Sequence, residues 1–177
     1  MQMKKENKRN GEIAEDKFMD WLDQHGIPYL YIHQDPDTFS QELKYKYTKR
    51  PDFLVCLPRS RPILVDVKYG GSRGESETCL IKTYEPEEYK RLQEKFGLKS
   101  WYVISNNGND YGTWFWASTD KIDKILKNLR QNKEKKYKNC YKVSIREFKR
   151  VLNYDSLKNM IESSEQSDTE ILNSFWI

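Results

Sequence analysis

Two aspartates and a lysine stand where neighbouring extended segments would bring them together. Asp52 opens the apolar run DFLVCL (52–57), and a second apolar run, ILVDVKY (63–69), contains Asp66 and Lys68. Side chains alternate across a strand, so Asp66 and Lys68 should project from the same face. The linker PRSRP between the runs suits a hairpin connection. Reversal of the chain there would set Asp52 close to Asp66.

These residue types suit metal-assisted hydrolysis of a phosphodiester bond. Two carboxylates that approach each other repel unless a cation lies between them, and hard oxygen ligands favour Mg²⁺ or Mn²⁺. A lysine beside them could orient a water molecule or offset the charge that builds up on a phosphate. The alternative is an exposed Asp–Lys pair on a half-buried hairpin, and Asp-x-Lys taken alone favours that alternative.

The arrangement Pro51-Asp52, 13 residues, then Asp66-Val67-Lys68 resembles the signature of the PD-(D/E)XK nuclease superfamily, which includes restriction endonucleases and Holliday junction resolvases. The family core runs helix, three strands, helix, strand, and the patterns of residues 10–105 predict that order. The resemblance implies an α/β fold with a restriction endonuclease-like core: a mixed central β-sheet flanked by helices, here with extra C-terminal helices. It also implies an Mg²⁺- or Mn²⁺-dependent DNA endonuclease, with Asp52 and Asp66 holding the metal and Lys68 positioning the attacking water.

The family further implies a glutamate on the first helix that helps to hold the metal, and the helix predicted over 10–25 offers Glu12 and Glu15. At about 100° per residue, Glu15 projects beside Phe18 and Leu22, on the edge of the core-facing side, while Glu12 points further toward solvent. A carboxylate at such an edge is costly unless it meets a cation. Glu15 is therefore the predicted third ligand. Both glutamates could instead be solvated acids favoured by the helix dipole.

Three more side chains are candidates for the site. In related nucleases a Gln or Tyr on the second helix can approach it, which points to Gln93, whereas Tyr89 on the same face is expected to pack in the core. Lys82 could contact nucleic acid or could simply be exposed. Arg73, in the glycine-rich loop 70–78, could bind the phosphate backbone. That loop could also be a plain connector, and its two glutamates would repel nucleic acid.

Hydrophobic periodicity and turn residues predict the remaining elements. Helices are expected over 10–25, 86–96, 119–131, 144–152 and 155–163, the fourth from a capping box formed by Ser144 and Glu147. Strands are expected over 28–33, 52–57, 63–69, 80–84, 101–105 and 113–118, with weaker extended signals at 44–48 and 138–144.

Composition excludes several classes of protein. The chain has 177 residues, of which 37% are hydrophobic and 33% charged, so a soluble globular protein is expected. No apolar run approaches the roughly 20 residues that span a bilayer, and the charged N-terminus does not resemble a secretory signal. Three widely spaced cysteines indicate neither a disulfide framework nor a zinc site. A cytoplasmic protein without a membrane partner is the expectation.

Charge is distributed unevenly. Residues 121–150 contain 12 Lys/Arg against three acids, a balance of +9, so the rest of the chain carries −5 within the net charge of +4. The basic segment could be a solvated helical face or a surface that attracts a phosphate backbone. We expect residues 1–120 to form the nuclease-like core domain and 121–177 a basic helical extension packed on it.

The expected partner is nucleic acid, foremost double-stranded or branched DNA. The aromatic tail at 175–177 could serve a homodimer. Two alternatives share the expected fold: a catalytically inactive nucleic-acid-binding or scaffolding module, and an RNA-directed nuclease.

Overall fold

The computed structural model describes residues 2–33, 35, 40–45, 48–58, 60–70, 78–106 and 110–174. Its strands are β1 (Tyr29–Tyr31), β2 (Phe53–Val55), β3 (Ile63–Lys68), β4 (Thr78–Lys82), β5 (Ser100–Ser105), β6 (Trp114–Ser118), β7 (Cys140–Ser144) and β8 (Lys149–Val151). Its helices are α1 (Gln2–Gln24), α2 (Gln41–Tyr45), α3 (Glu85–Phe96), α4 (Thr119–Gln131) and α5 (Tyr154–Ser174), with a 3₁₀ turn, η3 (Ile145–Glu147).

The central sheet has six strands in the order β1-β2-β3-β5-β6-β8. Strands β3 and β5 run parallel, and every other neighbouring pair in this sheet is antiparallel, so the sheet is mixed. Helix α1, three strands, helix α3 and strand β5 follow one another in the predicted order, with α2 and β4 as additions. The predicted α/β class, with a mixed central sheet and flanking helices, is confirmed.

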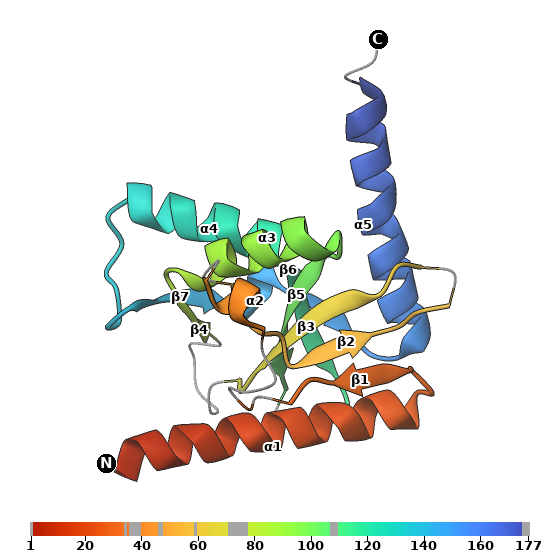
Figure 1. The fold of residues 1–177 in the computed structure, drawn as a ribbon. Helices are drawn as coiled ribbons and strands as arrows, with labels where there is room; N and C mark the ends of the chain where they lie inside the picture. Colours follow the sequence, from red (N-terminus) through yellow and green to blue (C-terminus); the bar gives the residue numbers. More distant parts are fainter. Residues whose placement is uncertain are drawn as a thin grey trace.

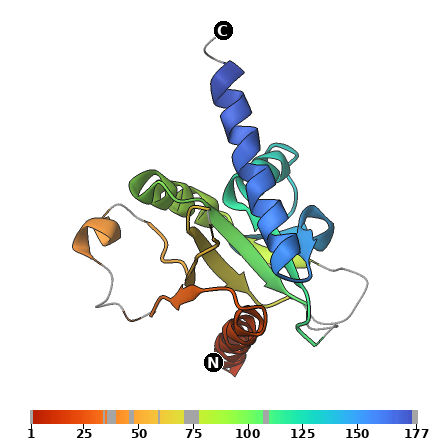
Figure 2. The ribbon, with the colours of Figure 1, turned by 90° about the vertical axis from the view of Figure 1, so that its right-hand side faces the viewer.

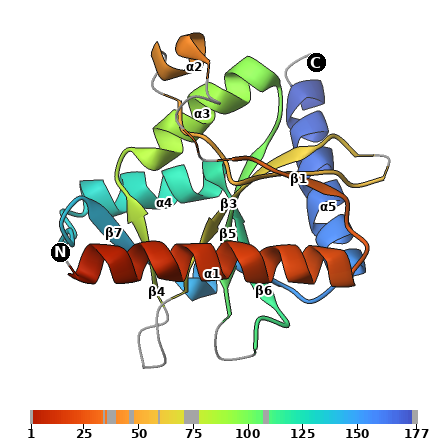
Figure 3. The same cartoon turned by 60° about the horizontal axis from the view of Figure 1, so that its bottom comes forward.

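Helices cover both faces of this sheet (Figures 1 and 3). Helix α1 lies along one face, and α3 and α4 lie on the other. Val65 and Val67 of β3 share a core cluster with Phe18 of α1, whereas Leu64 belongs to a second cluster with Tyr89 of α3. The alternation of β3 therefore directs Asp66 and Lys68, which share the parity of Leu64, toward the α3 side.

The predicted division at residue 120 is crossed by two strand pairings. Strand β4 pairs with β7 in a separate two-stranded sheet, and β6 pairs with β8. Helix α5 begins against the α1-side core through Leu157, Met160 and Ile161 and then extends away from the sheet (Figure 2). In the part of the chain that the structure describes, no helix is long and apolar enough to cross a membrane.

Two element predictions are wrong. Residues 144–152 form η3 and strand β8 instead of a helix: the Ser144 hydroxyl accepts from the Arg146 amide, and β8 then pairs with the edge of β6. A nine-residue helix gains little by itself, so the sheet edge prevails. In the weak extended signal at 44–48, Lys44 and Tyr45 instead belong to helix α2, where the Lys44 amide donates to the Ser40 carbonyl. Residues 46 and 47 lie outside the described residues.

Candidate active site

The β2–β3 hairpin brings the two aspartates together as predicted. Phe53 pairs with Val65 in an antiparallel register, which sets Asp52 across from Asp66. The Asp52 amide donates to the Val65 carbonyl at 2.8 Å, and Asp52 Oδ2 accepts from the amide of Val67 at 2.7 Å. Both aspartates are buried, with 8% of Asp52 and 3% of Asp66 exposed. Burial of two facing carboxylates is costly and requires compensating charge.

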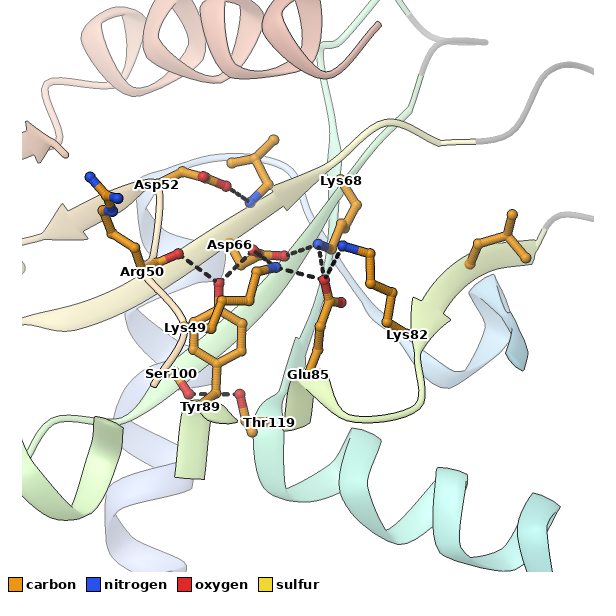
Figure 4. Close-up of polar contacts among 12 residues, drawn as sticks. Lys49, Arg50, Asp52, Asp66, Lys68, Lys82, Glu85, Tyr89, Ser100 and Thr119 are labelled. Carbon is orange, nitrogen blue, oxygen red and sulfur yellow. Dashed lines mark hydrogen bonds and ion pairs between the residues drawn. The ribbon is translucent and has the colours of Figure 1, made fainter. Parts of the chain in front are cut away.

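Asp66 receives that compensation from three side chains (Figure 4). Lys68 Nζ lies 2.7 Å from Asp66 Oδ2, and Lys49 Nζ lies 2.7 Å from Oδ1. The Tyr89 hydroxyl also donates to Oδ1. Burial raises the pKa of Asp66, but the two ammonium groups outweigh it and hold the pKa below its ordinary value. Asp66 therefore stays ionised on the α3 side of the sheet.

Glu85 is a member of the site that sequence reasoning missed. It is the first residue of α3 and is 1% exposed. Its Oε1 lies 2.8 Å from Lys49 Nζ, 3.3 Å from Lys68 Nζ and 3.7 Å from Lys82 Nζ. An acid in the first turn is ordinary, but its spacing of four residues from Tyr89 places both on one helical face. That spacing was the available signal.

The pKa of Asp52 shifts in the opposite direction from that of Asp66. Burial, followed by repulsion from Asp66 and Glu15, raises the pKa of Asp52 to about 8. Glu15 projects from α1, where the Tyr31 hydroxyl donates to its Oε2 at 2.8 Å. Burial also raises the pKa of Glu15, and repulsion from Asp66 adds to that rise. The carboxylates of the three predicted metal ligands therefore repel one another, and a bound cation would relieve that repulsion.

The carboxylate oxygens of the site are the type of ligand that a hard divalent cation prefers. Asp52 and Asp66 offer carboxylate oxygens on facing strands, and the buried Glu85 Oε2 has no hydrogen-bond partner within the described part of the chain. No group of three or more carboxylate, imidazole or thiol side chains among the described residues is already arranged around a metal position. In this arrangement lysines, rather than a third carboxylate, surround Asp66.

The other predicted site residues lie in different settings. Gln93 Oε1 accepts from the Ser100 amide at 2.7 Å and from the Ser100 hydroxyl at 2.9 Å, so it ties α3 to β5. Of the pair on this helix, Tyr89 is the residue that contacts Asp66, which reverses the expected preference for Gln93. Lys82 reaches Glu85 with half of its side chain exposed. Arg73 falls outside the described residues.

Comparison with known proteins gives structural neighbours. No protein-family model matches the chain, and a search of curated proteins finds no match. Among solved structures, Hjc, a Holliday junction resolvase from the archaeal hyperthermophile Archaeoglobus fulgidus, is 11% identical with a TM-score of 0.47, over 78% of this chain and 91% of that chain. A nuclease from a fusselovirus is 18% identical with a TM-score of 0.48, over 93% of this chain and 96% of that chain.

Proposed function

We propose that this protein is a metal-dependent nuclease of the PD-(D/E)XK type that hydrolyses phosphodiester bonds in DNA. One observation carries the proposal: Asp52 and Asp66 meet on facing strands, with the Lys68 ammonium 2.7 Å from Asp66. Two carboxylates and a lysine with this spacing combine an ion site with a donor for the reacting water or phosphate.

Each residue has a distinct part in the proposed reaction. Asp52 and Asp66 would hold Mg²⁺ or Mn²⁺, with Glu15 as a third carboxylate on the α1 side. When bound, such an ion polarises a phosphoryl oxygen and lowers the pKa of a coordinated water. Lys68 is anchored between Asp66 and Glu85, so its remaining N–H donor can orient the water or stabilise charge on the phosphate.

The basic segment supports a nucleic acid as the substrate. Every Lys and Arg of residues 121–150 is exposed, on α4, on the following loop and on β7 to β8. Exposed cations at this density release counterions from a phosphate backbone when it binds. Two copies of the site would allow both strands of a duplex to be cut in one encounter, so a homodimer belongs to the proposal.

Cleavage assays test the proposal directly. The full chain is incubated with labelled duplex, four-way-junction and single-stranded DNA and with RNA, in Mg²⁺, in Mn²⁺ or in EDTA. We expect metal-dependent cutting of DNA that Asp66→Asn reduces at least 100-fold. Cutting confined to RNA would replace the substrate, and the absence of metal-dependent cutting on every substrate would refute the enzyme.

A second candidate is a nucleic-acid-binding module without catalysis. It is favoured by the contacts of Asp66, because ammonium or hydroxyl donors already engage both of its oxygens. Titration with Mn²⁺ separates the two candidates. A ligand that binds the folded state raises its stability, so the nuclease should melt at a higher temperature with metal, and Asp52→Asn should lose much of that increase. An inert module should not respond.

A further inference from the structure

Three lysines from three different elements meet at one carboxylate oxygen. Lys49 precedes β2, Lys68 lies in β3 and Lys82 ends β4, and all three ammonium groups lie within 3.7 Å of Glu85 Oε1. Figure 4 shows the three side chains approaching Glu85 from different directions. Lysines ordinarily extend their charged ends into water. Their convergence on a buried acid therefore needs an explanation beyond solubility.

The exposures show which side of this cluster is open. The Glu85 side chain is 1% exposed, whereas those of Lys49, Lys68 and Lys82 are 22%, 21% and 51% exposed. Glu85 is thus the most deeply buried member of the cluster, and Lys82 is the most exposed. Asp66 and Glu85 supply two negative charges against three positive ones, and Glu88 is a further acid that interacts electrostatically with Lys49 and Lys82.

We infer that Glu85 is a positioning residue that gathers Lys49, Lys68 and Lys82 into a binding site for a phosphodiester group of DNA. This inference rests on the proposed function, because the cluster adjoins the Asp52–Asp66 pair. Each ammonium has three N–H donors, and an ammonium binds phosphate as a compact point charge. In this inference Lys49 and Glu85 belong to the substrate-binding site, and the partner of Lys82 is a phosphodiester group of DNA.

DNA binding without metal tests the site independently of cleavage. Anisotropy of a labelled DNA duplex is measured in EDTA over a series of salt concentrations, with wild type, Lys49→Gln, Lys82→Gln and Lys158→Gln. Loss of one phosphate contact should lower the salt slope by about 0.9 and weaken binding about eight-fold at roughly 0.1 M salt. Lys158 is the matched control, since it pairs with Glu162 on α5, away from the cluster.

Lys49→Gln and Lys82→Gln should both lower the slope of the salt dependence of DNA binding, whereas Lys158→Gln should leave it unchanged. Lys82 is half exposed, so its variant should fold even if Lys49→Gln does not. Wild-type binding that is absent in EDTA, or Lys49→Gln and Lys82→Gln slopes equal to wild type, would overturn the inference.

Glu85→Gln distinguishes positioning from net charge. Removal of an acid would tighten DNA binding if only the total charge mattered. Loss of the common anchor should instead weaken binding several-fold and lower the slope, with the melting temperature recorded for each variant, and Glu85→Asp should restore part of the binding. Tighter binding by Glu85→Gln would sink the positioning role. If these effects on DNA binding appear but no cleavage is detected, the nuclease proposal fails and the phosphate site stands. If DNA is cleaved but Lys49→Gln binds DNA as wild type does, the phosphate site fails and the nuclease proposal stands.

Discussion

The Asp52 carboxylate accepts a hydrogen bond from the amide of Val67, the residue between Asp66 and Lys68, over 2.7 Å. The Asp52 side chain, just before β2, thus takes the place of a backbone carbonyl as the acceptor for the Val67 amide near the end of β3. This bond orients Asp52 toward the strand that carries the other two residues. It also favours the ionised form, yet burial and repulsion from Asp66 and Glu15 prevail and raise the pKa of Asp52 to about 8.

The raised pKa of Asp52 predicts how stability depends on pH. An unfolded aspartate titrates near pH 4, so at intermediate pH the folded state binds a proton that the unfolded state has lost. The stability of the metal-free protein should therefore fall as pH rises from about 5 toward 8, by on the order of a few kcal/mol. Melting in EDTA from about pH 5 to 9 measures this fall.

Asp52→Asn should flatten that profile without abolishing it, because the pKa of Glu15 is raised as well and contributes in the same direction. Asp66 does not confuse the result, since its pKa is lowered and its contribution is lost only in more acidic solution. A profile that is equally steep in the variant would contradict the assignment to Asp52.

Asp66→Ala should destabilise the protein strongly. Among the described residues, the substitution leaves Glu85 as the remaining carboxylate paired with Lys49 and Lys68, and breaking a buried ion pair typically costs about 3 kcal/mol. Asp123→Ala is the matched control, because Asp123 also holds two lysines, Lys90 and Lys127, which are 39% and 54% exposed. Asp123 is itself 6% exposed, but its two lysines are better solvated than Lys49 and Lys68, so we expect a smaller loss of stability. Urea unfolding measures the free energy of unfolding of both variants. Equal losses would contradict the larger contribution assigned to the buried ion pairs of Asp66.

Tyr89→Phe removes the hydroxyl that contacts Asp66 Oδ1 and, at 3.3 Å, the Arg50 carbonyl. The hydroxyl donates to Oδ1, while the ring stacks edge-to-face on Tyr102 at 5.6 Å and would be retained. Loss of a bond to a charged acceptor should cost about 1.5–3 kcal/mol and reduce cleavage. In Tyr102→Phe, the deleted hydroxyl is buried without a partner in the described structure, so that variant should be neutral or more stable. Similar losses in both would assign the effect to the rings.

Local sequence patterns were sufficient for the hairpin that carries Asp52, Asp66 and Lys68. The alternation of ILVDVKY gives each side chain its face within one strand, and the prolines of PRSRP require a reversal. The face of the strand on which each side chain lies can therefore be predicted without knowing which distant residues it contacts. The same reasoning placed helix α3 within one residue of its observed start.

Lys49, Glu85 and β8 were beyond local patterns because each depends on a distant partner. Lys49 lies in a polar, irregular stretch, and its position follows from ion pairs with Asp66 and Glu85. Strand β8 forms because β6 offers it a free edge. Tyr89 resembled an ordinary core residue, and it is buried, yet its hydroxyl has a polar partner that apolar periodicity does not encode.

Gln93→Ala tests the catalytic role that the family resemblance implied. In the structure, Gln93 Oε1 accepts hydrogen bonds from both the amide and the hydroxyl of buried Ser100. Its loss leaves a buried donor unpaired, which should cost about 1–3 kcal/mol, while the cleavage rate per folded molecule should change less than about two-fold. Rates and melting temperatures measured on the same preparations decide. A large rate loss at unchanged stability would restore Gln93 to the active site.

Gly70→Ala should disturb the end of the strand that carries Lys68. Gly70 follows β3 by two residues, and its amide donates to the Ser105 hydroxyl at 2.7 Å. A methyl group there would lie 2.2 Å from the Ser105 carbonyl oxygen, a backbone atom that cannot turn aside, so β3 and β5 must separate. We expect a loss of at least about 1–3 kcal/mol, as for other overpacked sites, together with reduced cleavage.

Gly11→Ala is the opposite control for that substitution. Gly11 lies inside α1, and an added methyl group would meet nothing within 4 Å. Alanine is the better helix former by about 1 kcal/mol, so this variant should melt at a higher temperature and cleave as wild type does. Thermal unfolding and single-turnover cleavage of both variants measure the contrast. If Gly70→Ala were as stable as wild type, the close packing of β3 on β5 beside Lys68 would be wrong.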